Sequence, residues 1–138
     1  MLETDFVVTI HDEIIAELGG LPGFASGGRG GVESALQRVE NHACYAGLGD
    51  VLGIASLYAE AIARGHVFND GNKRTALACA LAYLAEQEVH VPKDWILEET
   101  IVMLAEGTWD YGDFAWLLGL LAGIHKRKPI KHPKGTFE

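Results

Sequence analysis

Residues 51–88 of the 138-residue chain read VLGIASLYAEAIARGHVFNDGNKRTALACALAYLAEQE. Apolar side chains recur at helical spacing over residues 51–64, and Asp50 just before them is a favoured helix N-cap. A polar loop over residues 66–72 follows. Over residues 73–88 leucines again share one face, and the alanines between them allow close packing. The stretch therefore predicts two helices joined by a short polar loop.

The rest of the chain also has helical patterning. Further helices are expected at residues 10–18, 32–39, 94–106 and 111–124. A glycine-rich loop with one proline is expected at residues 19–31, where it would be either a functional lid or poorly ordered. Val89-His90-Val91 before Pro92 leaves room for one minor short hairpin. The sequence therefore predicts an all-α fold of about six helices.

Composition and charge narrow the class of protein. The length suits one domain, nearly half the residues are apolar, and the net charge of −8 argues against a general nucleic-acid binder. The longest apolar run, residues 114–124, is about half of what a membrane span needs. Met1 to Ile10 lacks the features of a signal peptide. We therefore expect a cytoplasmic protein that binds neither membrane nor nucleic acid directly.

The two ends of the chain differ in character. We expect residues 1–124 to form one helical domain and residues 125–138 to form a basic, flexible tail.

Cys44 and Cys79 lie far apart and do not suggest a disulfide framework.

The loop at residues 66–72 and the start of the next helix carry the chemistry. Asn72 is a favoured N-cap, so Lys73 and Arg74 would be the first two residues of that helix. Cations there oppose the helix dipole, unless an anion sits over the helix end. Together with the free N–H groups, these two side chains indicate a phosphate site.

Neighbouring residues extend this site. His66 is suited to take a proton from a hydroxyl, and Asp70 supplies an oxygen ligand suited to Mg²⁺ bound to phosphates. Phe68 would point inward and pin the loop, and Gly71 permits unusual backbone angles. Each residue alone has an ordinary structural explanation, but their coincidence within nine residues favours a site. The segment is not a calcium-binding loop, because it lacks the alternating acidic ligands. It is not a Walker A loop either, because the preceding strand and the glycine spacing are missing.

At these residues the sequence resembles the Fic/Doc family. The family signature fixes seven positions without gaps. They are His66, Phe68, Asp70, Gly71, Asn72, Lys73 and Arg74. Residues 19–23, 63–66 and 72–77 further resemble the Doc branch, the toxins of toxin–antitoxin pairs.

Three departures from the wider family matter. Most Fic enzymes have Pro after the His, Gly after the Asn and a second Arg three residues after the first. This chain has Val67, Lys73 and Leu77 there. Fic enzymes with the full pattern transfer AMP to a hydroxyl, whereas Doc-type proteins invert the nucleotide and transfer its γ-phosphate. The resemblance thus implies a protein kinase that uses ATP and Mg²⁺ and acts on a threonine or serine of elongation factor Tu, halting translation.

The resemblance also implies a role for each site residue. His66 would activate the target hydroxyl, and Asp70 would hold Mg²⁺. Phosphates would be bound by Asn72, Lys73 and Arg74, with Gly71 completing the loop. Two alternatives remain open: a Fic-type AMP transferase, against which Lys73 and Leu77 argue, and a non-catalytic toxin that only grips the translation machinery.

Control is expected to come from a separate protein. Self-inhibited Fic proteins carry a Ser/Thr-x-x-x-Glu-Gly/Asn helix, and the nearest runs, residues 36–41 and 102–107, lack the Ser/Thr. A Phd-type antitoxin, which neutralises Doc-type toxins by folding to a helix in a groove, is therefore the expected partner. Residues near Phe114, Trp116 and Leu117 would suit such a groove, but packing in the core explains them as well.

Overall fold

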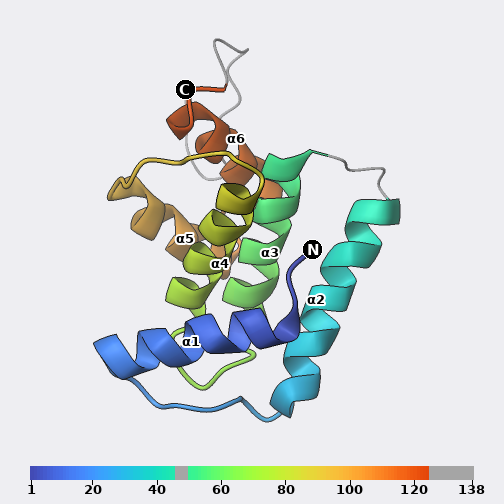
Figure 1. Cartoon of the computed structure of the whole chain (residues 1–138), viewed down its shortest axis with the longest axis vertical. Helices are drawn as coiled ribbons and strands as arrows, with labels where there is room; N and C mark the ends of the chain where they lie inside the picture. The colour runs from blue at the N-terminus through green and yellow to red at the C-terminus, as the bar shows by residue number, and fades with distance from the viewer. Residues whose placement is uncertain (46–49, 125–138) are drawn as a thin grey trace.

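The computed structural model of this chain describes residues 1–45 and 50–124 (Figure 1). It contains six helices: α1 Thr4–Leu18, α2 Gly28–Tyr45, α3 Val51–Gly65, α4 Asn72–Glu86, α5 Ile96–Glu106 and α6 Tyr111–Leu121. The part of the chain described holds no β-strand, which confirms the predicted all-α fold. The predicted tail at residues 125–138 lies outside the described residues.

Helix α3 is the centre of the domain. It runs antiparallel to α4, with which it has its most extensive contact, and it also packs against α2, α5 and α6 (Figure 1). Helix α1 crosses one end of the α3–α4 pair and packs on α4. The loop that joins α3 to α4 emerges at that same end, next to the connection between α1 and α2. The core therefore presents this loop at the edge of the molecule.

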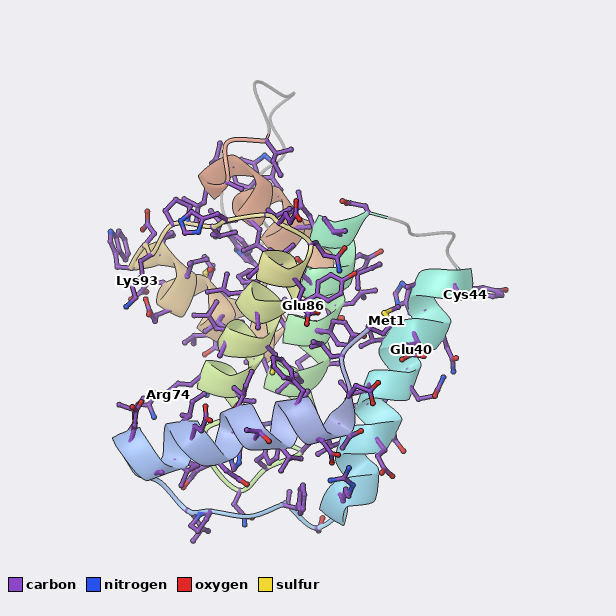
Figure 2. All side chains as sticks on the ribbon, viewed as in Figure 1. Met1, Glu40, Cys44, Arg74, Glu86 and Lys93 are labelled. Atoms are coloured by element: carbon purple, nitrogen blue, oxygen red, sulfur yellow. The ribbon has the colours of Figure 1, made fainter. Side chains whose placement is uncertain are left out.

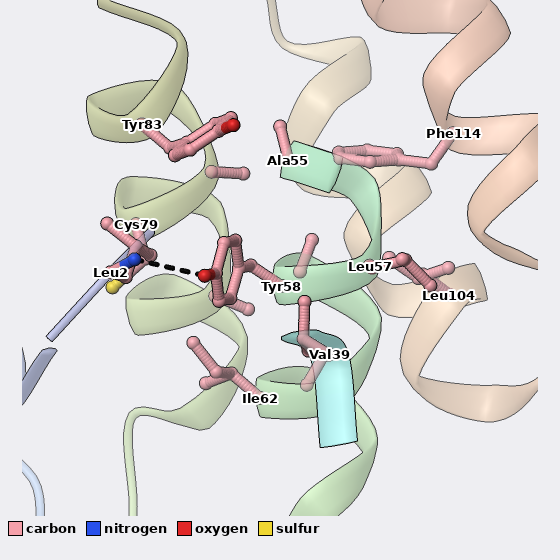
Figure 3. Close-up of a cluster of buried hydrophobic side chains, with 14 of the residues drawn as sticks. Leu2, Val39, Ala55, Leu57, Tyr58, Ile62, Cys79, Tyr83, Leu104 and Phe114 are labelled. Carbon is pink, nitrogen blue, oxygen red and sulfur yellow. Dashed lines mark hydrogen bonds between the residues drawn. The ribbon is translucent and has the colours of Figure 1, made fainter. Parts of the chain in front are cut away.

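The core gives the loop a rigid frame. Tyr58 and Ile62 of α3 are fully buried, as are Leu104 of α5 and Phe114 of α6. Figure 3 shows Tyr58 among these side chains, with its hydroxyl oxygen accepting a hydrogen bond of 3.0 Å from the backbone N–H of Leu2. Burial of such side chains contributes about 1.5–3 kcal/mol each. The chain start is thereby fastened to the central helix.

Several predicted helix boundaries were wrong. Helix α1 begins at Thr4 rather than residue 10, and α2 spans Gly28–Tyr45 rather than residues 32–39. Glycines at the start of α2 have low intrinsic helix propensity, which led to the late predicted start. Packing of Val32, Leu36 and Val39 into the core overrides that propensity. The glycine-rich connection is consequently shorter than predicted and ends at residue 27.

Two smaller expectations are also settled. Residues 89–91 do not form a hairpin strand, and the isolated antiparallel bridge of the described part joins Phe24 to Phe68 instead. In α6, Phe114 and Leu117 are buried in the core, so packing in the core explains these two residues. Within residues 1–45 and 50–124, no helix has the length and apolar character that crossing a membrane requires.

Candidate functional site

His66 occupies the first position of the loop between α3 and α4. It is the C-cap of α3, with φ 48° and ψ 47°, and its side chain is exposed. A non-glycine residue in this left-handed region is uncommon and costs free energy that the surrounding structure must offset. The left-handed turn directs the chain away from α3, and the histidine side chain lies at the surface.

Asn72 fastens the loop rather than capping the helix. The N-cap of α4 is Gly71, at φ 80°, and Asn72 is the first helical residue, so the predicted N-cap was wrong by one position. The Asn72 side-chain amide accepts a hydrogen bond from Phe68 N–H at 3.0 Å and donates one to the Phe68 carbonyl at 2.9 Å. The amide thus holds both backbone groups of Phe68 and gives the loop a fixed shape.

Phe68 anchors the loop in the core, as predicted. Its side chain is only 2% exposed. Its ring lies flat against the buried ring of His11 from α1, with centroids 3.7 Å apart and planes 7° from parallel. The loop is therefore fixed at its middle while its polar residues face outward.

The Asp70 carboxylate is exposed but not free to rotate. Its Oδ2 atom accepts a hydrogen bond of 2.6 Å from the backbone N–H of Leu21. Gly20 makes this approach possible: its φ is 120°, and a Cβ there would lie 3.3 Å from the Cβ of Asp70 and 3.1 Å from Ile15 Cδ1. The two glycines ahead of Leu21 therefore let the chain deliver an N–H group to the carboxylate.

The glycine-rich connection is ordered against the loop. Asn69 N–H donates to the Gly23 carbonyl at 3.1 Å, and Ala25 N–H donates to the Val67 carbonyl at 3.0 Å. The Asn69 side chain adds a hydrogen bond of 3.0 Å to the Pro22 carbonyl. Of the two sequence-based alternatives for this connection, poor order is thus wrong. The connection lies directly against the loop.

The N-terminus of α4 forms the cationic part of the site. Lys73 and Arg74 are its second and third residues, and both are exposed. Neither takes part in the ion pairs found within residues 1–45 and 50–124. The first N–H groups of a helix have no intrahelical acceptor, and the dipole there attracts anions. The arrangement suits a phosphate group.

The donor set fits Mg²⁺ that is carried mainly by phosphates. Among the described residues, no three His, Cys, Asp or Glu side chains gather closely enough to hold a metal by themselves. Asp70 offers a lone exposed carboxylate, and only its Oδ2 atom is engaged by the Leu21 N–H group. Magnesium commonly binds one or two carboxylates together with phosphates and waters. Asp70 is the residue that would hold such an ion.

A groove opens beside this cationic end. Its volume is about 510 Å³, and its wall is mostly apolar, with contributions from α1, α4 and α5. The apolar lining includes Ile14, Leu18, Leu77, Ala78, Leu81, Leu97, Ile101 and Val102. Its charged lining consists of three basic residues, Lys73, Arg74 and Lys93, and two acidic residues, Asp94 and Glu98. Figure 2 shows Arg74 and Lys93 on the same side of the molecule.

Three contributors to the site were not predicted from the sequence. They are His11, whose ring supports the loop, and Gly20 and Leu21, which hold the Asp70 carboxylate. One signal was available for His11, because it lies one turn before Ile15 on the apolar side of α1. No local signal marks the Leu21 N–H group, since every non-proline residue carries one.

Comparisons with known proteins identify the family to which the chain is similar. The model of the Fic/DOC family matches residues 1–84, which include α1, the glycine-rich connection and the whole loop. The chain is also 37% identical over 117 residues to a protein named protein kinase doc from Escherichia phage P1. That similarity covers 85% of this chain and 91% of the phage protein.

Proposed function

The chain belongs to the Fic/Doc family, and we propose that it is a Doc-type toxin that transfers the γ-phosphate of ATP to a protein hydroxyl. The similarity to the phage protein kinase extends over nearly the full length of both chains. We propose elongation factor Tu as the target, at a threonine or serine, with arrest of translation as the result. The resemblance to the Doc branch supports this choice of target.

The observation that carries the proposal is the place of Lys73. It is the second residue of α4, exposed, at the point where the helix end attracts a phosphate. A glycine there would let two phosphates approach the backbone closely, as AMP transfer requires. A lysine side chain occupies that space and offers its charge to a phosphate farther out. Leu77, one turn later, is apolar and cannot bind a phosphate in place of an arginine.

The proposed reaction is a direct phosphoryl transfer. His66 takes the proton from the target hydroxyl as its oxygen forms a bond to the γ-phosphorus. The bond between that phosphorus and the β–γ bridging oxygen breaks, and ADP leaves. Lys73, Arg74 and the N–H groups of α4 stabilise the negative charge on the phosphates. Asp70 would hold Mg²⁺, which would supply further positive charge to the phosphates.

Two labelled forms of ATP test this proposal. The protein is incubated with a cell lysate and ATP labelled at either the α- or the γ-phosphate, with the His66→Ala variant as the control. We expect label from the γ-phosphate alone on a protein of the size of elongation factor Tu, and none with the variant. Label from the α-phosphate would instead establish AMP transfer.

We propose that the groove along α1, α4 and α5 receives the helix of a Phd-type antitoxin. The apolar floor suits the apolar face of an amphipathic helix, and Lys73 and Arg74 at the start of α4 suit acidic residues of that helix. Lys73 and Arg74 belong both to the groove edge and to the proposed phosphate site. A helix in the groove would therefore cover the residues that bind nucleotide, which gives neutralisation a direct physical basis.

A charge placed in the groove tests this partner. Leu18 is 61% exposed, so Leu18→Glu should leave the fold intact while placing a carboxylate in the apolar lining. We expect the variant to remain toxic and to escape neutralisation by the co-expressed antitoxin. Leu120→Glu, at a residue 48% exposed on α6 and outside the groove, is the matched control and should stay neutralised. Equal neutralisation of both variants would place the antitoxin elsewhere.

A further inference from the structure

We propose that His11 of α1 is a positioning residue for the reaction, which holds the backbone of Asp70 so that its carboxylate faces the phosphate site. This inference rests on the proposed function, because it concerns how the Mg²⁺-binding residue is held. His11 itself is fully buried and touches no reacting group.

The contact that carries the inference is a hydrogen bond from α1 to the loop. The Nε2 atom of His11 lies 2.8 Å from the carbonyl oxygen of Asp70. A carbonyl oxygen only accepts, so the Nε2 atom carries the hydrogen and donates it. Asp70 is thus held at two points: its carbonyl by His11 and its carboxylate by the N–H of Leu21 at 2.6 Å. Two fixed points on one residue set the direction of its side chain.

The other contacts of His11 orient its ring for this bond. One face of the ring stacks on Phe68 at 3.7 Å between centroids. The Nδ1 atom lies 3.2 Å from Oδ1 of Asp12, an exposed carboxylate. Gly71 adds no side chain on this side: a Cβ there would lie 3.6 Å from Cδ2 of His11. The ring therefore lies in a slot formed largely by the loop between α3 and α4.

A purely structural role explains these contacts poorly. Burying an imidazole removes it from water and costs free energy unless its nitrogens find partners, whereas a leucine or phenylalanine would fill the same space without that cost. The buried partner of His11 is a backbone carbonyl of the loop that carries Asp70. A histidine at this position is therefore explained if its N–H group serves to hold the Asp70 carbonyl in place.

Two substitutions test the contributions of the His11 ring and of its N–H group separately. His11→Phe keeps an aromatic ring on Phe68 and removes the donor. His11→Gln loses the ring and keeps an amide N–H at the position of Nε2. Val7→Ala, at a fully buried residue one turn earlier on α1, is the control for a loss of stability that leaves the loop contact untouched.

The readouts are phosphate transfer by the full-length protein and its calorimetric affinity for ADP over a Mg²⁺ titration. For His11→Phe we expect roughly a tenfold or greater loss of transfer and a higher Mg²⁺ requirement, because small misplacements of reacting groups are costly. His11→Gln should recover most of the transfer activity and should bring the Mg²⁺ requirement close to that of the wild type. Val7→Ala should melt at a lower temperature but keep the wild-type Mg²⁺ requirement.

Other outcomes would overturn the inference. It fails if His11→Phe keeps the wild-type Mg²⁺ requirement, or if His11→Gln loses as much as His11→Phe. It also fails if Val7→Ala changes the Mg²⁺ requirement in the same way. A wild type that binds Mg²⁺ and ADP but transfers no phosphate would count against the proposed function alone, since the Mg²⁺ titration of the variants still decides the role of His11.

Discussion

At the scale of single residues, the site combines an exposed histidine side chain with a carboxylate that is held by hydrogen bonds. His66 is held by its backbone, in the left-handed region at the end of α3. Asp70 is held by its carbonyl and its carboxylate together. The difference suits their proposed roles, because a base must reach an incoming hydroxyl, whereas a metal ligand must stay in place.

Removing the base should remove the chemistry without removing the fold. The His66 side chain is exposed, so His66→Ala should change the free energy of unfolding by no more than about 0.5 kcal/mol. Transfer should fall by about 10²- to 10⁴-fold, the usual contribution of a general base. Unfolding in urea and the rate of labelling by γ-labelled ATP measure the two quantities. Undiminished growth arrest by the folded variant would favour a toxin that acts by binding alone.

The two glycines before Leu21 offer a matched pair of substitutions. Gly19 and Gly20 have φ angles of 87° and 120°, so alanine is strained at either one. A Cβ at Gly19 meets nothing within 4 Å, whereas a Cβ at Gly20 would lie 3.3 Å from that of Asp70. Gly19→Ala should therefore cost about 1 kcal/mol of stability and leave nucleotide binding unchanged.

Gly20→Ala should cost more and also disturb the site. To relieve the contact, the chain must move away from Asp70, which separates the Leu21 N–H from the carboxylate. We expect a weaker Mg²⁺-dependent affinity for nucleotide, measured by calorimetry at equal concentrations of folded protein. Equal affinity in the two alanine variants would show that the Leu21 contact does not matter for binding.

At the scale of elements, the first turn of α4 is destabilised by two cationic side chains. Lys73 and Arg74 lie at the positive end of the helix dipole, where each costs a few tenths of a kcal/mol when no anion is bound. A bound phosphate reverses the sign of that interaction. The proposed phosphate site would thus exist at a small cost to the stability of the empty helix end.

Arg74→Ala should therefore separate ligand binding from stability. The melting temperature without ligand should stay level or rise slightly, and the increase caused by Mg²⁺ and nucleotide should be mostly lost. Arg38→Ala removes an equal charge from the exposed face of α2 and serves as the control, with the ligand-induced increase intact. A large loss of stability without ligand would show that Arg74 is a structural residue.

The elements also show what local pattern could and could not predict. The helices on either side of the loop were predicted closely, because their apolar spacing and the Asp50 cap are local signals. The start of α2 was missed because its glycines disfavour a helix that only tertiary packing supports. Asn72 was placed as an N-cap because asparagine favours that position, whereas its amide instead binds Phe68 four residues earlier.

At the scale of the whole molecule, burial in the core predicts a response to alkaline pH. Burial raises the pKa of the Cys79 thiol from 9.0 to about 12. Above pH 9.0 the unfolded chain loses this proton while the folded chain keeps it, so the stability falls as the pH rises toward 12. The loss approaches about 1.4 kcal/mol for each pH unit in this window.

Cys79→Ala should weaken that response. Urea unfolding at neutral pH and at about pH 10.5 should show a smaller loss of stability for the variant than for the wild type. Burial also raises the pKa of Tyr58 and of Tyr83, so some alkaline sensitivity should remain. The same loss in both proteins would mean that the thiol is not responsible.

The whole fold also explains which parts of the site escaped prediction. The residues from His66 to Arg74 are contiguous, so their pattern was visible in the sequence and the family comparison agrees with it. The contacts of Asp70 with His11 and with Leu21 span 59 and 49 positions of the chain. Contacts of that range depend on how α1 crosses α4, which no local spacing encodes.

The chemical nature of the transferred group is the most direct test of the central claim. Purified protein is incubated with ATP, Mg²⁺ and purified elongation factor Tu, and the intact mass of the factor is measured by mass spectrometry. We expect the mass to rise by one phosphate group, with no change for the His66→Ala variant. A rise by one AMP group, or an unchanged mass, would contradict the proposal that this loop transfers the γ-phosphate to elongation factor Tu.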